Sequence, residues 1–264
     1  MLQYQPIVAL VDVDPDALPE ESGQLWPQLL ARGLRTSPLF ETLVRIPDGR
    51  GEFIAPDAFL PTAERFNLMR SIDRWVLTRA LEALAELHQR GEQAVFTINL
   101  SGQSMDDEHL VPLIESTLTR LALDPGCVVF EVTETQAIAH LERALRLMTS
   151  LQELGCRFAL DDFGSGYSSF PHLKHLPVDF IKIDGSFVQG IASDPMDRAI
   201  VSAINDIAHS HGKLTIAEAV ERAEDVRLLK ACGVDYIQGH YLAEPSADPL
   251  SGPTPRRQKR APGG

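Results

Sequence analysis

The polar residues best suited to chemistry stand at or near the ends of short apolar segments. In chain order they are Glu41, Asn99, Glu131, Glu134, Asp161, Asp162, Lys182, Asp184, Glu218 and Gln238. If the apolar segments are parallel strands, their carboxyl ends meet on one face, where barrel proteins build their sites. We therefore expect these side chains to converge on one mouth.

Several carboxylates close together raise one another's pKa, and divalent cations remove that cost. Oxygen ligands, with Asn99 as a neutral amide among the acids, suit Mg²⁺ or Mn²⁺ better than zinc. The adjacent Asp161 and Asp162 would let one carboxylate bridge two ions while its neighbour binds the second. Two ions about 3.5–4 Å apart are a recurring arrangement for displacement at phosphorus.

A simpler interpretation fits any one of these residues, because a single acid at a strand end is usually a helix cap or a surface charge. Lys182 alone could merely neutralise a carboxylate. For the whole set this interpretation fails, since chance would not place polar residues in so many apolar strands. The His and Cys spacing of zinc sites is absent. The GSG at 164–166 is too short for a nucleotide-binding fingerprint.

The elements that must position these residues are eight short apolar segments rich in β-branched residues. They span 2–10, 39–45, 95–101, 128–134, 157–163, 180–184, 214–220 and 236–242. Most are continuous apolar runs, as strands buried on both faces are. Longer segments with helical periodicity separate them, and a glycine often precedes the next strand. This alternation predicts parallel βα units that close into a (β/α)8 barrel of the TIM type, with all eight strands parallel.

Composition restricts the class of protein. The 264 residues carry a formal net charge of −13, which disfavours binding of a nucleic-acid polymer. The three cysteines are scattered and predict reduced thiols in a cytoplasmic protein. No apolar run approaches the roughly 20 residues of a membrane helix, and the N-terminus lacks the basic region of a signal peptide.

Two segments interrupt the alternation. Residues 11–38 look like an insertion between the first two strands, with a helix around Leu25–Leu30. Residues 246–264 are rich in Pro, Gly and basic residues, and we expect them to be a disordered tail. The expected domain is therefore a barrel over 1–245, followed by that tail.

Seven ordered motifs give the chain a close resemblance to the EAL family of cyclic di-GMP phosphodiesterases. After YQPIV at 4–8, the motifs are ETLVR (41–45), INLS (98–101), EVTET (131–135), DDFGSGYSS (161–169), KIDGSFV (182–188), AEAVE (217–221) and IQG (237–239). The naming motif here has Thr42 where the family usually has Ala. AEAVE has Ala219 where the family usually has Gly. The resemblance covers residues 2 to about 245, apart from the 11–38 segment, but the helix that usually precedes the first strand is absent.

The resemblance implies roles for individual residues. One metal would be held by Glu41, Asn99, Glu131 and Asp161, and the second by Asp161, Asp162 and Glu218. Catalytic roles fall to Lys182 beside the attacking water, to Gln238, which helps to orient it, to Glu218, and to Glu134, which would brace the DDFG loop. Substrate contacts fall to Gln5, Arg45, Asp184 and Glu221.

The resemblance also implies a fold and a function. Its barrel has a first strand antiparallel to the others. Its activity is hydrolysis of cyclic di-GMP to linear pGpG with two Mg²⁺ or Mn²⁺ ions. A homodimer through the DDFG-loop region, and sensory or diguanylate cyclase domains in a longer parent protein, would be its partners. The alternative within the family is a weak or inactive domain that acts as a cyclic di-GMP receptor. An unrelated metal-dependent barrel, such as an enolase-like lyase, would explain the carboxylates but not the ordered motifs.

Overall fold

Eight strands form a closed barrel in the computed structural model, which describes residues 1–49, 53–165 and 173–250. Around the barrel the order is β1 (Leu2–Ala9), β10 (Tyr236–Gln238), β9 (Leu214–Ala217), β8 (Phe180–Ile183), β7 (Arg157–Phe163), β6 (Val128–Thr133), β5 (Val95–Asn99) and β2 (Leu39–Val44). Each of the eight predicted segments contains one of these strands, so the predicted TIM-type barrel is confirmed.

The prediction that all eight strands are parallel is wrong, because β1 runs antiparallel to both of its neighbours. Ile7 pairs with Leu39 of β2 and with Gln238 of β10. The reversed first strand implied by the family resemblance is confirmed. An apolar run shows that a strand is buried but carries no information about its direction, which is why the pattern alone misled.

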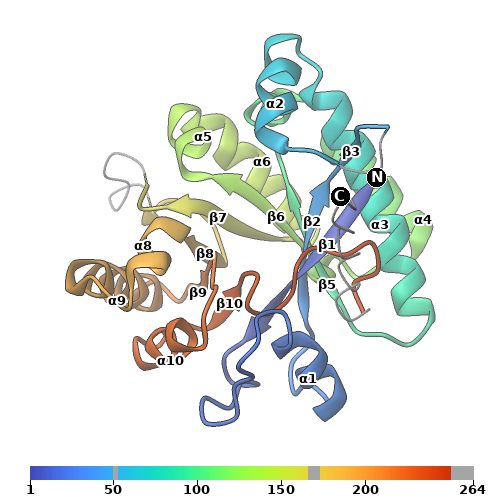
Figure 1. Cartoon of the computed structure of the whole chain (residues 1–264). Coiled ribbons are helices and arrows are strands. Elements are labelled where there is room, and N and C mark those ends of the chain that lie inside the picture. Colours follow the sequence, from blue (N-terminus) through green and yellow to red (C-terminus); the bar gives the residue numbers. More distant parts are fainter. Residues whose placement is uncertain (50–52, 166–172, 251–264) are drawn as a thin grey trace, which may run out of the picture.

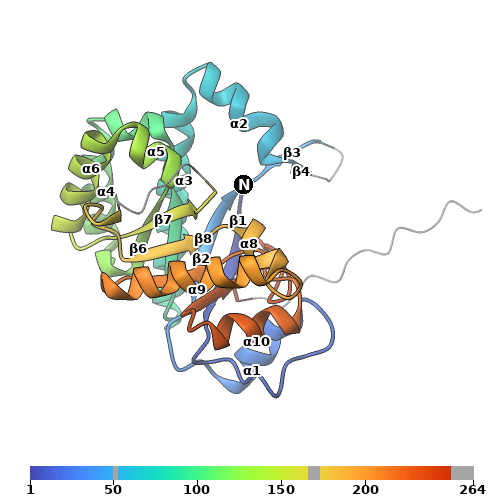
Figure 2. The ribbon, with the colours of Figure 1, turned by 90° about the vertical axis from the view of Figure 1, so that its left-hand side faces the viewer.

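Helices surround the barrel (Figure 1). In chain order they are α1 (Leu25–Arg32), α2 (Pro56–Arg65), α3 (Met69–Gln89), α4 (Leu110–Leu121), α5 (Glu134–Ala139), α6 (Leu141–Glu153), α8 (Gly185–Gly190), α9 (Pro195–Ser210) and α10 (Ala223–Ala231), with short 3-10 turns η1 (Gly102–Asp106) and η2 (Pro125–Cys127). The strands β3 (Ile46–Pro47) and β4 (Phe53–Ile54) form a separate small sheet beside α2 (Figure 2). Among the described residues, no helix has the length and apolar character to cross a bilayer.

The 11–38 segment connects β1 to β2 and carries α1. Trp26 of α1 packs edge-on against Phe40 of β2, with ring centroids 5.5 Å apart. The Trp26 backbone N–H also donates to the Leu242 carbonyl at 3.1 Å. Since β1 and β2 are antiparallel neighbours, this segment leaves and re-enters the barrel at the end where the seven parallel strands begin.

The barrel interior has an apolar floor beneath a polar layer. The floor is made by Ile7, Leu39, Val95, Val129, Ala159, Phe180 and Ile216, with Tyr236 packed against them. Side chains alternate along a strand with a period of two. The next inward positions toward the carboxyl ends are therefore Glu41, Thr97, Glu131, Asp161, Lys182, Glu218 and Gln238, with Gln5 on the reversed β1. The floor closes this polar layer from below.

Ser246, the first residue of the predicted tail, contacts the barrel. Ser246 pairs with Tyr4 of β1 through two backbone hydrogen bonds of 2.7 and 2.9 Å, which fix this part of the chain beside β1. The structure describes residues as far as 250, so the rest of the predicted tail, 251–264, lies outside the described residues.

A strained turn follows β9. Ala219 has φ +53, in the left-handed region where a side chain is disfavoured, and the family usually has Gly at this position. The next residue is held on both sides, because Val220 N–H donates to Gln238 and the Val220 carbonyl accepts from Tyr241. These hydrogen bonds hold the turn in place, so Ala219 keeps a backbone conformation that favours glycine.

We expect Ala219→Gly to raise the free energy of unfolding by about 0.5–1 kcal/mol. The left-handed conformation costs a non-glycine residue roughly 1–2 kcal/mol, and the greater freedom of glycine in the unfolded chain offsets part of the gain. Ala217→Gly, two residues earlier in β9, is the matched control and should lower the same free energy. Urea unfolding of both variants measures this; a less stable Ala219→Gly would contradict strain at this turn.

Candidate active site

The ammonium of Lys182 lies at the centre of the polar layer. Its Nζ atom is 2.7 Å from Glu131, 2.8 Å from Glu218, 3.0 Å from Asp161 and 3.9 Å from Glu41. Lys182 and Glu131 are fully buried. The sequence prediction that Lys182 points into the barrel mouth is confirmed, and the structure adds that it touches four carboxylates at once.

Burial and crowding shift the pKa values of these groups. Burial raises the pKa of Glu131 to about 8, with Lys182 opposing and the charges of Glu41 and Asp161 adding to the rise. The pKa of Glu218 rises to about 8 for the same main reason. Burial lowers the pKa of Lys182, but the surrounding acids outweigh it and hold the value well above the usual one. The single positive charge of Lys182 therefore cannot neutralise all four carboxylates around it when they are ionised.

Amide side chains join this charged group to β1. Asn99 Nδ2 donates to Glu41 Oε1 at 2.9 Å, and Gln238 Nε2 donates to Glu41 Oε2 at 2.6 Å. Gln238 Nε2 also lies 3.1 Å from Gln5 Oε1. Gln5 pairs directly with Glu41 in the antiparallel ladder. The reversed direction of β1 thus brings Gln5 level with the polar layer.

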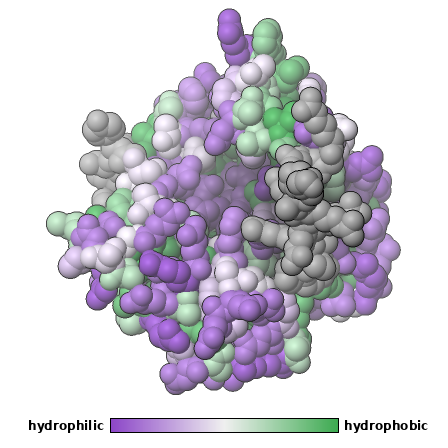
Figure 3. Space-filling model, in the orientation of Figure 1, coloured by the Kyte–Doolittle hydropathy of each residue, from purple (hydrophilic) through white to green (hydrophobic). Residues whose placement is uncertain are grey.

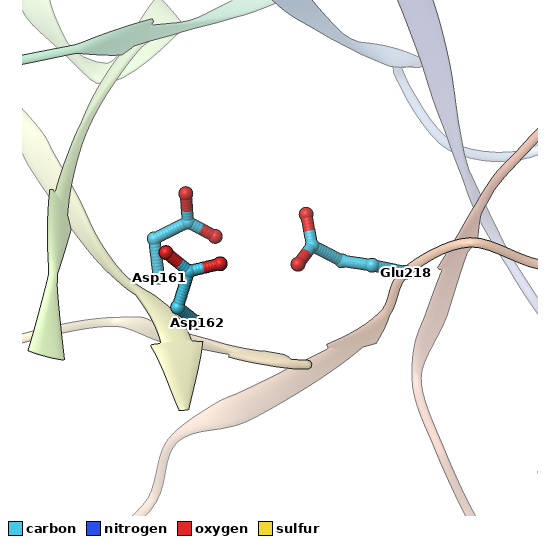
Figure 4. A group of neighbouring side chains, drawn as sticks. All are labelled: Asp161, Asp162 and Glu218. Atoms are coloured by element: carbon cyan, nitrogen blue, oxygen red, sulfur yellow. The ribbon is translucent and has the colours of Figure 1, made fainter. Parts of the chain in front are cut away.

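Three carboxylates form an open group beside Lys182. Ligand oxygens of Asp161, Asp162 and Glu218 all lie within 4.8 Å of one another (Figure 4). Adjacent residues in a regular strand point to opposite faces. Here the register between β7 and β8 shifts after Leu160, and Asp162 has φ +56. This irregularity lets two successive side chains face the same space.

The donor set fits a hard divalent cation. Every side-chain ligand in this layer offers oxygen, and no His or Cys stands among them. Glu131 Oε1 is buried and accepts no hydrogen bond from any described residue. A buried carboxylate oxygen without a partner is costly. A cation bound between Glu131 and its neighbours would supply that partner.

A cavity of about 300 Å³ opens above the three carboxylates. It is lined by Gln5, Glu41, Asp162, Asp184, Gly185, Glu218, Ala219, Glu221, Gln238, Gly239 and His240. The space-filling view shows a hydrophilic hollow at the centre of the molecule (Figure 3). Asp184 also caps α8, since its side chain accepts from the Ser186 N–H at 2.8 Å. Asp184 and Glu221 therefore lie beside the predicted metal ligands.

A second cavity of about 270 Å³ lies between the barrel rim and α2, α3 and α5. Its lining includes Arg45 and Asn99 among mainly apolar residues. Arg45 Nε donates to Gln3 Oε1 at 3.0 Å, which fixes the guanidinium at the end of β2. Of the predicted substrate contacts, Arg45 lies in this second cavity, whereas Gln5, Asp184 and Glu221 line the first.

Glu134 lies outside both cavities. It is buried at the start of α5, and its Oε2 accepts from the Gly164 N–H at 2.8 Å. This bond ties α5 to the loop that follows Asp161 and Asp162. Residues 166–169 of the DDFGSGYSS motif lie outside the described residues, as do residues 170–172 and with them much of the predicted dimer region.

Asp73 is a buried acid near the site that was not predicted from the sequence. This residue is 4% exposed on α3, and one of its oxygens accepts three hydrogen bonds from Ser101 and Ser104, just after the predicted ligand Asn99. The available signal was an acid one turn before Val76 and Leu77, on the face that α3 buries. A buried carboxylate on such a face indicates a specific hydrogen-bonding task.

Comparison with known proteins identifies the family. The sequence profile of the EAL domain matches residues 34–245, which is most of the chain. The chain belongs to the EAL domain family. Solved EAL domains agree in fold. The FimX EAL domain from Pseudomonas aeruginosa bound to c-di-GMP superposes with a TM-score of 0.80 at 32% identity, over 95% of this chain and 92% of that one.

Other relatives extend the comparison. The PaMucR phosphodiesterase in a c-di-GMP complex gives a TM-score of 0.78 at 30% identity, over 93% of this EAL domain and 91% of that chain. The cyclic di-GMP phosphodiesterase PdeB of Shewanella oneidensis is 40% identical over 78% of this chain and 24% of its own length. The cyclic di-GMP phosphodiesterase PdeF of Escherichia coli is 37% identical over 81% of this chain and 28% of its own length. This EAL domain thus spans about a quarter of the length of these two proteins.

The raised pKa of Glu131 predicts how stability depends on pH. Its folded value of about 8 lies above the ordinary value of about 4.3, so between these values the folded protein holds a proton that the unfolded chain has released. The free energy of unfolding without divalent cations should therefore fall as pH rises from about 5 to 8. Glu218, whose pKa is also raised to about 8, should add to the effect in the same direction.

Urea unfolding in the presence of a chelator, at several pH values, measures this dependence. Glu131→Gln cannot titrate at this position and should make the curve less steep, while the Glu218 contribution stays. Added Mg²⁺ should stabilise the wild type more at pH 8 than at pH 5, because the cation replaces the proton. A wild-type protein that becomes steadily more stable from pH 5 to 8 without metal would show that Glu131 is ionised throughout.

Proposed function

We propose that this EAL domain is an enzyme that hydrolyses cyclic di-GMP to linear pGpG with two divalent cations, Mg²⁺ or Mn²⁺. The observation that carries the proposal is the polar layer above its apolar floor, which together with the neighbouring Asn99 and Asp162 brings all of the predicted ligands close to one another. The relatives named as cyclic di-GMP phosphodiesterases and the c-di-GMP complexes of other EAL domains support the same substrate.

Two groups of residues would hold the cations. Glu41, Asn99, Glu131 and Asp161 would hold one, and Asp161, Asp162 and Glu218 the other. When bound, the cations supply positive charge to the phosphate oxygens and acidify a water that can attack phosphorus. Asp161 would belong to both groups, as expected for an acid that faces both Lys182 and Asp162.

The two cavities would receive the two halves of the dinucleotide. Cyclic di-GMP carries a guanine base on each side of its ribose–phosphate ring. Asn99 lines one cavity and Glu41 the other, and a hydrogen bond joins these two side chains. Asp184 and Glu221 would accept hydrogen bonds from one half, and Gln5 would contact the phosphate ring. The Arg45 guanidinium would contact the other half, in the mainly apolar cavity suited to a purine.

Lys182 and Gln238 would act at the reacting phosphate. In the hydrolysis, water oxygen bonds to phosphorus, the bond from phosphorus to the 3′ oxygen breaks, and that oxygen takes up a proton. The Lys182 ammonium has three donors and no acceptor, so it can stabilise charge that builds on the phosphate oxygens. The Gln238 amide would orient the attacking water, and Glu134 would keep the Asp161–Asp162 segment in place through Gly164.

The alternative is a cyclic di-GMP receptor without significant turnover. A site in which a ligand carboxylate had been replaced would favour it, whereas here Glu41, Glu131, Asp161, Asp162 and Glu218 are all present. The complete set favours hydrolysis. A homodimer through the DDFG-loop region and fused sensory or cyclase domains stay predictions from the family resemblance.

The direct test is to incubate the purified protein with cyclic di-GMP and follow pGpG by chromatography. We expect turnover with Mg²⁺ or Mn²⁺ and none with excess chelator. Ca²⁺ should inhibit, because it prefers longer bonds and more ligands. Glu41→Gln should fold but lose most activity. Equal turnover with and without chelator would contradict the cation requirement, and binding without turnover under every metal would favour the receptor.

A second test concerns Lys182. Lys182→Gln removes the charge but keeps hydrogen-bond donors, and turnover should fall on the order of 100-fold because stabilisation of the transition state is lost. Binding of cyclic di-GMP, measured with Ca²⁺ to prevent turnover, should stay within about tenfold. If Lys182 only neutralises the acids around it, higher Mg²⁺ should restore the rate fully.

Lys213→Gln is the matched control for this test. Lys213 is also largely buried, but its ammonium donates to the Leu176 and Val178 carbonyls, outside the polar layer. This variant should lose stability and keep the turnover of its folded fraction. Full rescue of Lys182→Gln by Mg²⁺ would rule out the catalytic role.

A further inference from the structure

Asp73 joins α3 to the loop that follows β5. A single carboxylate oxygen, Oδ2, accepts from the Ser101 backbone N–H at 3.0 Å, from the Ser101 hydroxyl at 2.6 Å and from the Ser104 hydroxyl at 2.7 Å. Otherwise the face that α3 buries is apolar, and Met69, Val76 and Leu77 flank Asp73 on it. A carboxylate in such surroundings needs strong partners, and this one has all three on the same loop.

The loop held by Asp73 determines where Asn99 lies. Asn99 is the last residue of β5 and is itself exposed, so packing does little to fix its side chain. Two backbone anchors follow it directly. Leu100 N–H donates to the Glu131 carbonyl at 2.9 Å, and Ser101 N–H donates to Asp73. With the backbone on its C-terminal side held in this way, the Asn99 side-chain amide donates to Glu41 at 2.9 Å.

We propose that Asp73 is a positioning residue for the first cation site, because its bond to the Ser101 N–H sets the backbone from which Asn99 reaches the cation. The inference rests on the proposed function for the identity of that site. It adds a residue from α3, outside the barrel strands and outside the motifs that define the resemblance. Two other roles are possible for the same carboxylate: direct contact with ligand, since Asp73 lines the second cavity, or simple fastening of the loop.

The experiment measures Mn²⁺ binding by electron paramagnetic resonance, without substrate, for the wild type and Asp73→Asn. Loss of the residue that orients a metal ligand typically weakens metal affinity about 10–100-fold. We expect about a tenfold weaker site in Asp73→Asn and a smaller shift of the same sign in Ser101→Ala, which keeps the backbone N–H. The double variant should be less than additive, because both changes act on one hydrogen-bonded unit.

Asp235→Asn is the matched control. Asp235 Oδ2 also accepts from a backbone N–H and a hydroxyl of one residue, Thr215, and pairs with His209, but it lies at the end of the barrel remote from the mouth. This variant should lose a comparable amount of stability and bind Mn²⁺ as the wild type does. If both variants weaken Mn²⁺ binding equally, general loosening of the fold explains the effect and the proposal fails.

Activity assays separate the remaining roles. A positioning role raises the metal concentration for half-maximal turnover and leaves the KM for cyclic di-GMP at saturating metal within about twofold. A raised KM with unchanged Mn²⁺ affinity would make Asp73 a ligand contact and overturn the proposal. If Asp73→Asn does not fold, Asp73→Glu takes its place, because the longer side chain keeps the charge but moves the oxygen that accepts from the Ser101 N–H, and unchanged Mn²⁺ affinity in that variant overturns the proposal. A wild type that binds Mn²⁺ without hydrolysing cyclic di-GMP would contradict the proposed function. The positioning role of Asp73 would then be decided by the Mn²⁺ affinities of the wild type and Asp73→Asn alone.

Discussion

The structure depends on the electrostatic cost of holding four carboxylates around one buried ammonium. Lys182 contacts Glu41, Glu131, Asp161 and Glu218, so one positive charge faces four groups that are ordinarily negative. Burial and mutual repulsion raise the pKa of Glu131 and Glu218 to about 8. Protons can lower this cost, and so can cations. The site is therefore built to take up positive charge, and the fold must be rigid enough to keep the acids together.

The barrel supplies that rigidity from below and from β1. The apolar floor of inward side chains fills the barrel below the acids, so they have no water to reach on that side. The reversed β1 closes the ring and brings Gln5 opposite Glu41, so amides and not further acids complete the layer on that side. The irregular end of β7 turns Asp162 toward the same space as Asp161. The two departures from a regular parallel barrel thus each add a side chain to the mouth: the neutral Gln5 from the reversed β1 and Asp162 from the irregular end of β7.

Much of this could be predicted from sequence, and the reasons differ between elements. The eight strands were predictable because buried strands leave continuous apolar runs. Lys182 stood out because an ammonium in the middle of the apolar run FIKID must find polar partners inside the fold. The direction of β1 was not encoded in its own residues and came only from resemblance. Asp73 was missed because its partners lie about 30 residues away and meet it only in the folded chain. The turn at Ala219 shows the opposite case, since the family's usual Gly predicts the left-handed backbone that Ala219 adopts.

Under the proposed function, charge would link the binding of cations to the binding of cyclic di-GMP. Cyclic di-GMP is an anion, and a mouth lined by Glu41, Asp162, Asp184, Glu218 and Glu221 repels it while they are ionised. Arg45 lies in the second cavity and cannot offset that repulsion alone. Each cation bound between the acids would lower the repulsion and give the phosphate oxygens a partner. Cation and dinucleotide should therefore strengthen each other's binding by the same factor, as linkage requires. Under the proposed function, the acids whose mutual repulsion is costly are those that would couple cation loading to substrate capture.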